Sequence, residues 1–353
     1  MRIETKCVQA GYQPENGQPR ILPIYQSTTY KYDSAEHLGK LFDLSVPGHM
    51  YTRISNPTVE MVENKIAALE GGVGAMLTSS GQAANLLAVL NIASAGDNIV
   101  CSSAIYGGTI NLFAFTLKRL GIETRFFTPE ATDEEIHALF DGRTRLVFGE
   151  TVANPALIVC DIERLAHIAH AHCVPLVIDN TFPTPVLCRP IEFGCDIVTH
   201  STTKYMDGHA SVVGGCIVDS GKFDWQAAGK YPELTEPDES YHGVVYTKSF
   251  GRAAYINKAR AQLMRDFGCT PQPIAAFILN LGLESLAVRM ERHCENAQAV
   301  AEYLEKHSKV SWVNFPGLAS SPQHALAQKY LPKGVCGVVS FGVRASKYLS
   351  SWL

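Results

Sequence analysis

The sequence has no long apolar run and no excess of positive charge. Its 353 residues carry 30 Lys and Arg against 34 Asp and Glu, a formal net charge of −4, with both signs mixed along the chain. Such a chain offers no basic face to nucleic acid and no basic cluster beside a membrane segment. The first residues, MRIETKCVQAGYQPENG, hold early charges and no apolar stretch of signal-peptide length. We therefore expect no nucleic-acid partner, no membrane span and no secretion signal.

Paired cysteines and several common motifs are also missing. The ten cysteines are scattered without a Cys-x-x-Cys pair, so we expect reduced, mostly buried thiols in a cytoplasmic protein. The chain has no repeats, no Gly-x-Gly-x-x-Gly after a strand, no Walker loop and no Gly-x-Ser-x-Gly elbow, which disfavours nucleotide-binding and hydrolase functions. His167, His170 and His172 lack a fourth ligand and a second cluster, so we expect no metal site.

What the sequence does contain suits a large enzyme core. At 353 residues and 46% hydrophobic content, the chain is long enough for two or three domains. We expect residues 1–50 to be irregular, helices over 59–69 and 162–171, a strand pair within 211–218 and one helical run over 274–307.

Residues 174–209 form the most informative stretch. Two short β-branched apolar runs, at 174–178 and 197–198, each end in polar residues, as buried parallel strands do where they reach a functional edge. Asp179 follows the first run and Lys204 the second. In an open α/β sheet, both would lie at the carboxyl ends of strands, where ligands bind.

Asp179 and Lys204 are consistent with a plain salt bridge, but their neighbours favour an anion site. Residues 201–203 place three hydroxyls directly before Lys204, and Gly208 with His209 closes the turn. Pyridoxal phosphate needs a lysine for covalent attachment, an acid for its pyridine nitrogen and donors for its phosphate. All three are present at plausible spacing.

Four other motifs each have an ordinary structural interpretation beside a functional one. Tyr51 and Arg53, taken alone, are typical of an exposed surface pair. Residues 80–82 begin a helix that either is simply capped or binds an anion. Tyr106 beside a Gly-rich turn suits simple packing, and Asn154 before Pro155 is first a turn signal.

Taken together, the segments DNTF, HSTTKYMDGH, YTRISNPT, SSGQAANL, YGGTINLF and ETVANP resemble the Cys/Met-metabolism (trans-sulfuration) family of fold-type I pyridoxal-phosphate enzymes. Within that family, the chain is most similar to the O-acetylhomoserine sulfhydrylases. The likeness extends from Glu4 to about Val343. It implies an α/β fold with a mostly parallel sheet flanked by helices.

The resemblance also implies three parts. Residues 1–55 would form an N-terminal arm with inter-subunit contacts, residues 56–254 the PLP-binding α/β domain and residues 255–353 a C-terminal α+β domain. That last domain would be truncated relative to the family, without the serine and arginine that bind the substrate's α-carboxylate.

By resemblance, Lys204, Asp179 and Tyr106 are catalytic. Lys204 would attach the cofactor and move protons, Asp179 would keep the pyridine nitrogen protonated, and Tyr106 would stack on the ring. The cofactor-binding residues that it implies are Lys204, Asp179, Ser201, Thr203, Ser80, Gly81, Gln82, Tyr106, Tyr51, Arg53 and Asn154. Tyr51 and Arg53 would reach the cofactor of an adjacent subunit, so the site would be shared within a homo-oligomer, expected to be a tetramer.

The implied reaction is γ-replacement on O-acetylhomoserine by sulfide or a thiol, giving homocysteine and acetate in methionine biosynthesis. A methionine γ-lyase ranks second, because those enzymes typically carry Cys where this chain has Gly108. Cystathionine synthase or lyase activity ranks third. A non-catalytic fragment or binding subunit is the alternative from a different class.

Overall fold

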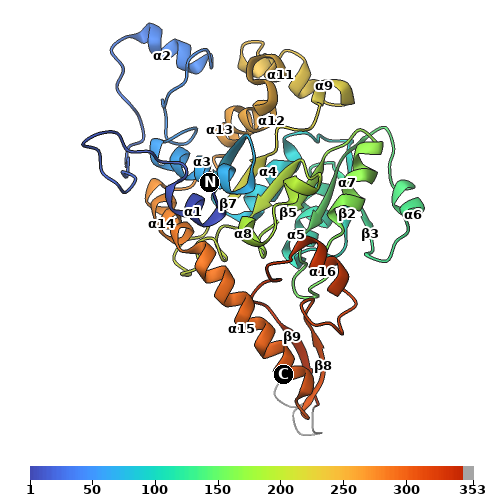
Figure 1. Cartoon of the computed structure of the whole chain (residues 1–353). Coiled ribbons are helices and arrows are strands. Elements are labelled where there is room, and N and C mark those ends of the chain that lie inside the picture. The colour runs from blue at the N-terminus through green and yellow to red at the C-terminus, as the bar shows by residue number, and fades with distance from the viewer. Residues whose placement is uncertain (345–353) are drawn as a thin grey trace.

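The computed structural model describes residues 1–344, and a mixed seven-stranded sheet lies at its centre (Figure 1). The strand order is β1-β7-β6-β5-β4-β2-β3. The strands are β1 (Gly74–Thr78), β2 (Asn98–Ser102), β3 (Glu123–Phe127), β4 (Thr144–Glu150), β5 (Leu176–Asp179), β6 (Ile197–His200) and β7 (Gly215–Asp219). Strand β7 pairs antiparallel with β1 and β6, whereas the pairs from β6 to β3 are parallel. The predicted mostly parallel sheet is confirmed.

Helices cover both faces of the sheet. The longer ones are α3 (Pro57–Glu70), α4 (Gly81–Leu90), α7 (Ile162–Ala171), α14 (Pro273–Glu284) and α15 (Leu286–Lys306). The shorter ones are α1 (Ile3–Gln9), α2 (Ala35–Phe42), α5 (Gly107–Asn111), α6 (Asp133–His137), α8 (Thr184–Leu187), α9 (Trp225–Ala228), α10 (Pro232–Thr235), α11 (Tyr246–Phe250), α12 (Ala254–Lys258), α13 (Arg265–Phe267) and α16 (His324–Tyr330).

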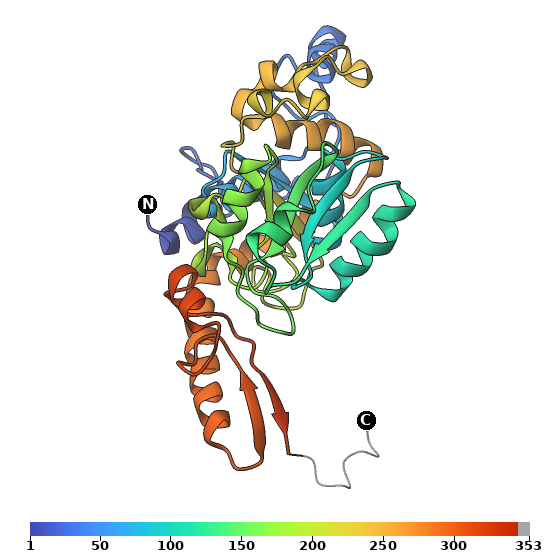
Figure 2. The same ribbon diagram turned by 90° about the vertical axis from the view of Figure 1, so that its right-hand side faces the viewer.

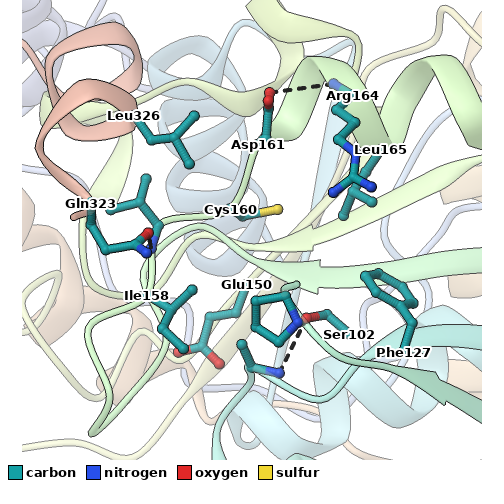
Figure 3. A pocket seen from close by; sticks show the side chains of 13 residues that line it. Ser102, Phe127, Glu150, Ile158, Cys160, Asp161, Arg164, Leu165, Gln323 and Leu326 are labelled. Atoms are coloured by element: carbon teal, nitrogen blue, oxygen red, sulfur yellow. Dashed lines mark hydrogen bonds between the residues drawn. The ribbon is translucent and has the colours of Figure 1, made fainter. Parts of the chain in front are cut away.

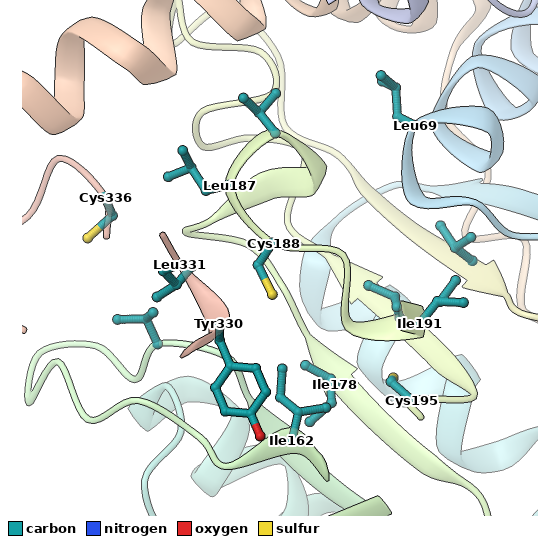
Figure 4. Close-up of a cluster of buried hydrophobic side chains, with 14 of the residues drawn as sticks. Leu69, Ile162, Ile178, Leu187, Cys188, Ile191, Cys195, Tyr330, Leu331 and Cys336 are labelled. Carbon is teal, nitrogen blue, oxygen red and sulfur yellow. The ribbon is translucent and has the colours of Figure 1, made fainter. Parts of the chain in front are cut away.

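Strand β5 shows how the chain alternates between the two cores. Ile178 packs in a cluster with side chains from α3 and α7, whereas Val177, one residue earlier, packs in a second cluster with α4 and α12. Figure 4 shows the first cluster, where Ile178 lies near Ile162 of α7. Because successive side chains of a strand point to opposite faces, an unbroken apolar run such as 174–178 requires both faces to be covered.

The helix predicted over 59–69 is α3, and its ends follow the expected chemistry. The side chain of Asn56 accepts hydrogen bonds from the backbone N–H groups of Thr58 and Val59, and Pro57 occupies the first turn. Gly71 ends the helix at a left-handed φ of 83°. The helix predicted over 162–171 is α7, with the same bounds.

Three predictions of local structure are wrong. Residues 1–50 contain α1 and α2; α2 begins at Ser34, whose side chain caps the helix by accepting from the backbone N–H of His37. The region 211–218 holds one strand instead of two, β7, which begins only at Gly215. A Cβ on Gly215 would lie 2.2 Å from the carbonyl oxygen of Ser80, so this glycine permits close packing and does not mark a hairpin. The single run over 274–307 is two helices, which meet at Ser285 with a 58° bend.

A separate layer follows the bend. Helix α15 packs against a two-stranded antiparallel sheet of β8 (Val310–Asn314) and β9 (Ser340–Val343), which are separated in sequence by α16. Figure 2 shows α15 and this sheet extending together away from the seven-stranded sheet. The predicted C-terminal part, residues 255–353, includes nine residues that lie outside those described here. Within residues 1–344, no single helix is both long and apolar enough to cross a membrane; α14 and α15 meet the criterion only as a bent pair.

Candidate active site

The two residues that the sequence places at strand ends lie at one edge of the sheet. Asp179 is the last residue of β5, and Lys204 comes four residues after the end of β6. Strands β5 and β6 are parallel neighbours, with Asp179 opposite Thr199. Their carboxyl ends therefore share one edge, as in other ligand-binding α/β sheets.

A pocket of about 210 Å³ opens at this edge. It contains every predicted site residue except Tyr51 and Arg53. Its lining residues are Ser80, Gly81, Gln82, Asn85, Tyr106, Thr109, Glu150, Asn154, Asp179, Thr181, Phe182, Ser201, Thr203, Lys204 and Val213. The fold thus gathers residues that are spread over more than 120 positions of sequence.

Asp179 is held by neutral donors. One carboxylate oxygen accepts from the side-chain amide of Asn85 at 3.3 Å, and the other accepts from the backbone N–H and hydroxyl of Thr181. The Thr181 hydroxyl also accepts from the backbone N–H of Ser201 at 2.8 Å, so it ties the end of β5 to the segment before Lys204. Only 8% of Asp179 is exposed. A buried carboxylate with directional donors and, among the residues that the structure describes, no paired cation suits a positively charged ligand group.

Lys204 has no acidic partner in the described part of the chain. No ion pair joins it to Asp179 or to any other carboxylate among residues 1–344, so the salt-bridge interpretation does not hold there. Its side chain is exposed and borders the pocket. The amine is therefore accessible to a ligand.

Helix α4 supplies backbone donors to the opposite wall. The Ser80 hydroxyl caps the helix by accepting from the backbone N–H of Ala83 at 3.1 Å, and the pocket is lined by Ser80, Gly81 and Gln82. A Cβ on Gly81 would lie 2.6 Å from the Cβ of Ser201, so only glycine lets the helix start approach residue 201 this closely. The unpaired N–H groups and positive dipole end of a helix N-terminus favour an anion.

Glu150 was missed by the sequence reasoning, although its signal is the same as that of Asp179. It is the last residue of β4 and lies opposite Asp179 in the β4–β5 register. Its carboxylate accepts from the backbone N–H of Tyr106 at 2.6 Å. Burial, together with the nearby charge of Asp179, raises the pKa of Glu150 well above its ordinary value. Asn85, Thr109, Thr181 and Phe182 lie inside the quoted motifs, but none was given a role there; Val213 lies outside all of them.

Glu150 also separates this pocket from a second one of about 180 Å³. Figure 3 shows the second pocket, which Glu150 borders together with Cys160, Arg164 and Gln323. Burial raises the pKa of the Cys160 thiol to about 12, so this cysteine is a poor nucleophile at neutral pH.

Tyr106 and Gly108 are packed together at the mouth of the pocket. A Cβ on Gly108 would lie 2.4 Å from a ring carbon of Tyr106 and 2.7 Å from the side-chain nitrogen of Gln82. Any larger residue at position 108 would force the ring to move. Glycine at this position therefore determines where the phenol of Tyr106 lies.

Tyr51 and Arg53 are not brought into the pocket. The Arg53 guanidinium lies 5.3 Å from the centre of the Tyr51 ring and donates to the backbone carbonyl of Arg265. Both side chains are exposed. Within one chain they form a surface pair.

The histidines of the α7 region make other contacts. The Nε2 of His170 lies 2.7 Å from the carboxylate of Asp196, and the Nε2 of His172 lies 2.8 Å from the Nδ1 of His137. Within residues 1–344, no group of three His, Cys, Asp or Glu side chains is arranged to hold a metal ion.

The residues that line the pocket fit pyridoxal phosphate. Lys204 offers an amine without an acid partner, Asp179 offers a buried carboxylate, and the start of α4 offers anion donors. The buried Oε1 of Gln82 has no hydrogen-bond partner within the described residues, which leaves a polar group for a ligand to satisfy. An open α/β sheet with this set of residues at its carboxyl edge defines the class of pyridoxal-phosphate-dependent enzymes.

The chain belongs to the Cys/Met metabolism PLP-dependent enzyme family, whose model matches residues 4–352. The resemblance read from the sequence motifs is confirmed, and pyridoxal phosphate is the cofactor of the family.

Individual relatives agree with the family. The chain is 48% identical over 345 residues to a homocysteine synthase of Schizosaccharomyces pombe, covering 97% of this chain and 80% of that protein. It is 47% identical over 346 residues to O-acetyl-L-homoserine sulfhydrylase 1 of Thermus thermophilus, covering 98% and 82%. A crystal structure from Campylobacter jejuni, described as an O-acetylhomoserine (thiol)-lyase with a pyridoxyl-lysine phosphate residue, has a TM-score of 0.94 at 34% identity and covers 98% of this chain and 86% of its own.

Proposed function

We propose that this chain catalyses γ-replacement on O-acetyl-L-homoserine with sulfide or a thiol. The Cγ–O bond of the ester breaks, acetate leaves with the bonding electrons, and a new Cγ–S bond forms as the sulfur nucleophile loses a proton; with sulfide the product is L-homocysteine. One observation carries the proposal. Lys204, Asp179 and the start of α4 line one pocket in a chain about as similar to a homocysteine synthase as to an O-acetylhomoserine sulfhydrylase.

Pyridoxal phosphate, when bound, supplies an electron sink that stabilises negative charge on substrate carbon. Asp179 would keep the pyridine nitrogen protonated, because its carboxylate is buried and pairs with no cation among residues 1–344. Lys204 would hold the cofactor through its Nζ, and the same amine would then take and return the protons at substrate Cα and Cβ. Tyr106, which lines the pocket, would stack on the ring and could donate its phenol proton to the leaving group.

The phosphate is held at the start of α4 and by the segment before Lys204. Ser80, Gly81 and Gln82 offer helix N-terminal donors, and Ser201 and Thr203 offer hydroxyls. Asn154, from the loop after β4, lines the same pocket and would bind the cofactor or the substrate carboxylate there. These contacts are remote from the reacting atoms and contribute binding energy that positions the substrate.

We infer further that Tyr51 and Arg53 serve the site of a second copy of this chain. Their exposure on the arm, outside their own pocket, supports this sharing. The chain would then divide into an arm over residues 1–55, a cofactor domain over 56–254 and a C-terminal domain over 255–353, and would assemble as a homo-oligomer, with a tetramer expected. The ten cysteines, all free and seven of them buried, support a reducing cytoplasmic setting.

The test is a spectrum followed by product analysis. Purified protein is given pyridoxal phosphate, and its visible absorption is recorded before and after O-acetylhomoserine is added without sulfide. A band of lysine-bound cofactor that shifts on adding the ester, followed by homocysteine formation with sulfide, supports the proposal.

The same assay separates the alternatives. Methanethiol released from methionine would point to a γ-lyase, and cystathionine formed from cysteine would point to a cystathionine synthase. A band that does not respond to any of these substrates would mean that the chain binds cofactor without turnover.

A further inference from the structure

Arg289, near the start of α15, directs its guanidinium at backbone carbonyls. One terminal nitrogen donates to the carbonyl oxygen of Tyr205 at 2.8 Å. The other donates to Gly282 at 2.7 Å and, at 3.5 Å, to Met206. Its Nε donates to the hydroxyl of Ser285 at 3.0 Å. All three nitrogens of the planar group are therefore engaged at once, which a lysine ammonium could not reproduce.

Two of these carbonyls belong to the turn that directly follows Lys204. Within the turn, the backbone N–H of Gly208 donates to the carbonyl of Lys204 at 2.8 Å, and that of Asp207 donates to Thr202 at 2.9 Å. The carbonyls of residues 205 and 206 thus lie at the end of a single helical turn. A cation placed at such carbonyls is stabilising for the same reason as at a helix C-terminus.

Asp207 supplies a negative charge near Arg289. It is fully buried, and its carboxylate accepts from the hydroxyl of Ser211 at 2.7 Å and from the backbone N–H groups of His209 and Ser211. Burial lowers the pKa of Arg289, and the nearby charge of Asp207 opposes that shift. Arginine remains charged over the working pH range even so.

Two glycines let the helix pair approach this turn. Gly208 has a left-handed φ of 70°, and a Cβ there would lie 2.1 Å from a terminal nitrogen of Arg289. On the helix side, a Cβ on Gly282 would lie 2.3 Å from the carbonyl oxygen of Asp207. Both close approaches involve backbone or the guanidinium itself, so the bend between α14 and α15 is packed directly on the lysine turn.

A second contact ties the same turn to the C-terminal layer. The phenol oxygen of Tyr205 accepts from the backbone N–H of Gly337 at 3.1 Å. The residue after Lys204 is therefore bound through its main chain to α15 and through its side chain to the segment that leads into β9. The strands of the sheet position the start of this loop, and the C-terminal layer positions its end.

We propose that Arg289 is a positioning residue for Lys204: it clamps the turn of residues 205–208 to the bend between α14 and α15. The place of the Lys204 amine in the pocket then depends on the orientation of α15. The contact network stands without the reaction, and the effect on turnover rests on the function proposed above.

Hydrogen exchange in cofactor-free protein tests the clamp without any assay of activity. We compare wild type with Arg289→Met, Arg289→Lys and the control Arg292→Met; Arg292 lies on the same helix, is 72% exposed in its side chain and pairs only with Glu295 among the described residues. We expect Arg289→Met to speed exchange over residues 202–211 by ~10-fold or more, with Arg289→Lys intermediate and Arg292→Met unchanged. Exchange over β4 reports whether the sheet remains folded.

Hydrogen exchange over residues 202–211 can also contradict the clamp. Wild-type exchange over residues 202–211 in a folded Arg289→Lys or Arg289→Met protein would overturn the proposal. If Arg289→Met loses protection in β4 as well, Arg289→Lys decides alone.

Kinetics with O-acetylhomoserine and sulfide then test the consequence. We expect Arg289→Lys to lower kcat by ~10-fold to 100-fold while KM changes less than about twofold, because a misplaced amine affects the chemical step more than binding. An equal loss in Arg292→Met, or a change in KM alone, would contradict a positioning role. If the wild-type protein shows no turnover, the proposed function is refuted. The hydrogen-exchange result still tests the clamp in that case.

Discussion

The pocket at the sheet edge and the arm before α3 contribute to the candidate site in different ways. Asp179 and its donors are buried, fixed by strand ends and by hydrogen bonds from Asn85 and Thr181. Tyr51, by contrast, is 38% exposed and contacts Arg53 rather than the pocket. The first region is assembled by the topology of one chain, whereas the second lies on its surface.

The contrast between the buried pocket and the exposed arm indicates which part of the site a single chain can form. Parallel strands bring their carboxyl ends together whatever the rest of the molecule does, so Asp179 and the Lys204 turn need no partner. An exposed arginine on an arm gains little from its own chain, since isolated surface contacts contribute at most about 1 kcal/mol. We therefore propose that Arg53 acts on the site of a second copy, which a coexpression test checks.

The largest expected effect comes from Lys204→Ala at the sheet edge. We expect turnover to fall by ~10³-fold or more, since both covalent attachment and proton transfer are lost. Dialysis after borohydride treatment measures attachment: wild type should retain the cofactor and the variant should release it. Thermal unfolding of the cofactor-free protein should be little changed, because Lys204 makes no ion pair within residues 1–344. Near-native turnover would remove Lys204 from the mechanism.

Asp179→Asn is expected to have the next largest effect. The amide keeps the shape but removes the negative charge, so we expect kcat to fall by ~10²-fold to 10³-fold with little change in KM. Steady-state kinetics measure the split between the two constants. The variant Asn85→Leu is the matched control, because it removes one donor to the same carboxylate and leaves the charge in place. If Asn85→Leu lowers kcat as much as Asp179→Asn does, hydrogen bonding and not the negative charge would be the important property of Asp179.

Arg53→Ala tests the arm. We expect cofactor affinity to fall by ~10-fold while the unfolding temperature stays within error, since its contacts within the chain are exposed. Arg20 is another exposed arginine of the arm, and Arg20→Ala should change neither the cofactor affinity nor the unfolding temperature.

Coexpression of Arg53→Ala with Lys204→Ala asks whether the arm acts across subunits. If the arginine is supplied by a partner, random pairing leaves about a quarter of the sites with both native residues, so activity should recover to that extent. No recovery above either parent would mean that Arg53 acts within its own chain or not at all.

The sequence predicted the sheet-edge region well because its rules are local. Strand runs that end in Asp179 and before Lys204, and the Asn56 cap with Pro57, are read from neighbouring residues alone. Glu150 ends β4 in the same way and opens the motif ETVANP, but within that motif only Asn154 was given a role. Gly215 was misread because its close approach to the carbonyl of Ser80 is a contact between distant segments.

The Arg289 contacts lie further beyond what the sequence predicts. Nothing near residue 289 indicates that its partners are carbonyls about 84 positions earlier in the chain. The break at Ser285 was also missed, since the residues on both sides favour helix and the bend comes from packing on the lysine turn.

The smallest expected effect lies at the opposite edge of the sheet, where Asp196 precedes β6 and pairs with His170. Its hydrogen bond raises the pKa of His170, against the effect of burial. The stabilisation is therefore fully present below pH 6.5 and is lost as the pH rises through the raised value. We expect His170→Gln to lower the free energy of unfolding by at most about 1 kcal/mol at pH 5.5, and by less at pH 9, since the side chain is 42% exposed.

Urea titrations at the two pH values measure this, with His167→Gln, an exposed histidine of the same helix, as the control. Turnover of His170→Gln should stay native, because the amino ends of these strands lie away from the pocket. An equal loss of stability at both pH values would show that the charge of His170 is not involved. A fall in kcat at unchanged stability would mean that the two edges of the sheet are coupled, so that the Asp196–His170 pair affects the pocket around Asp179.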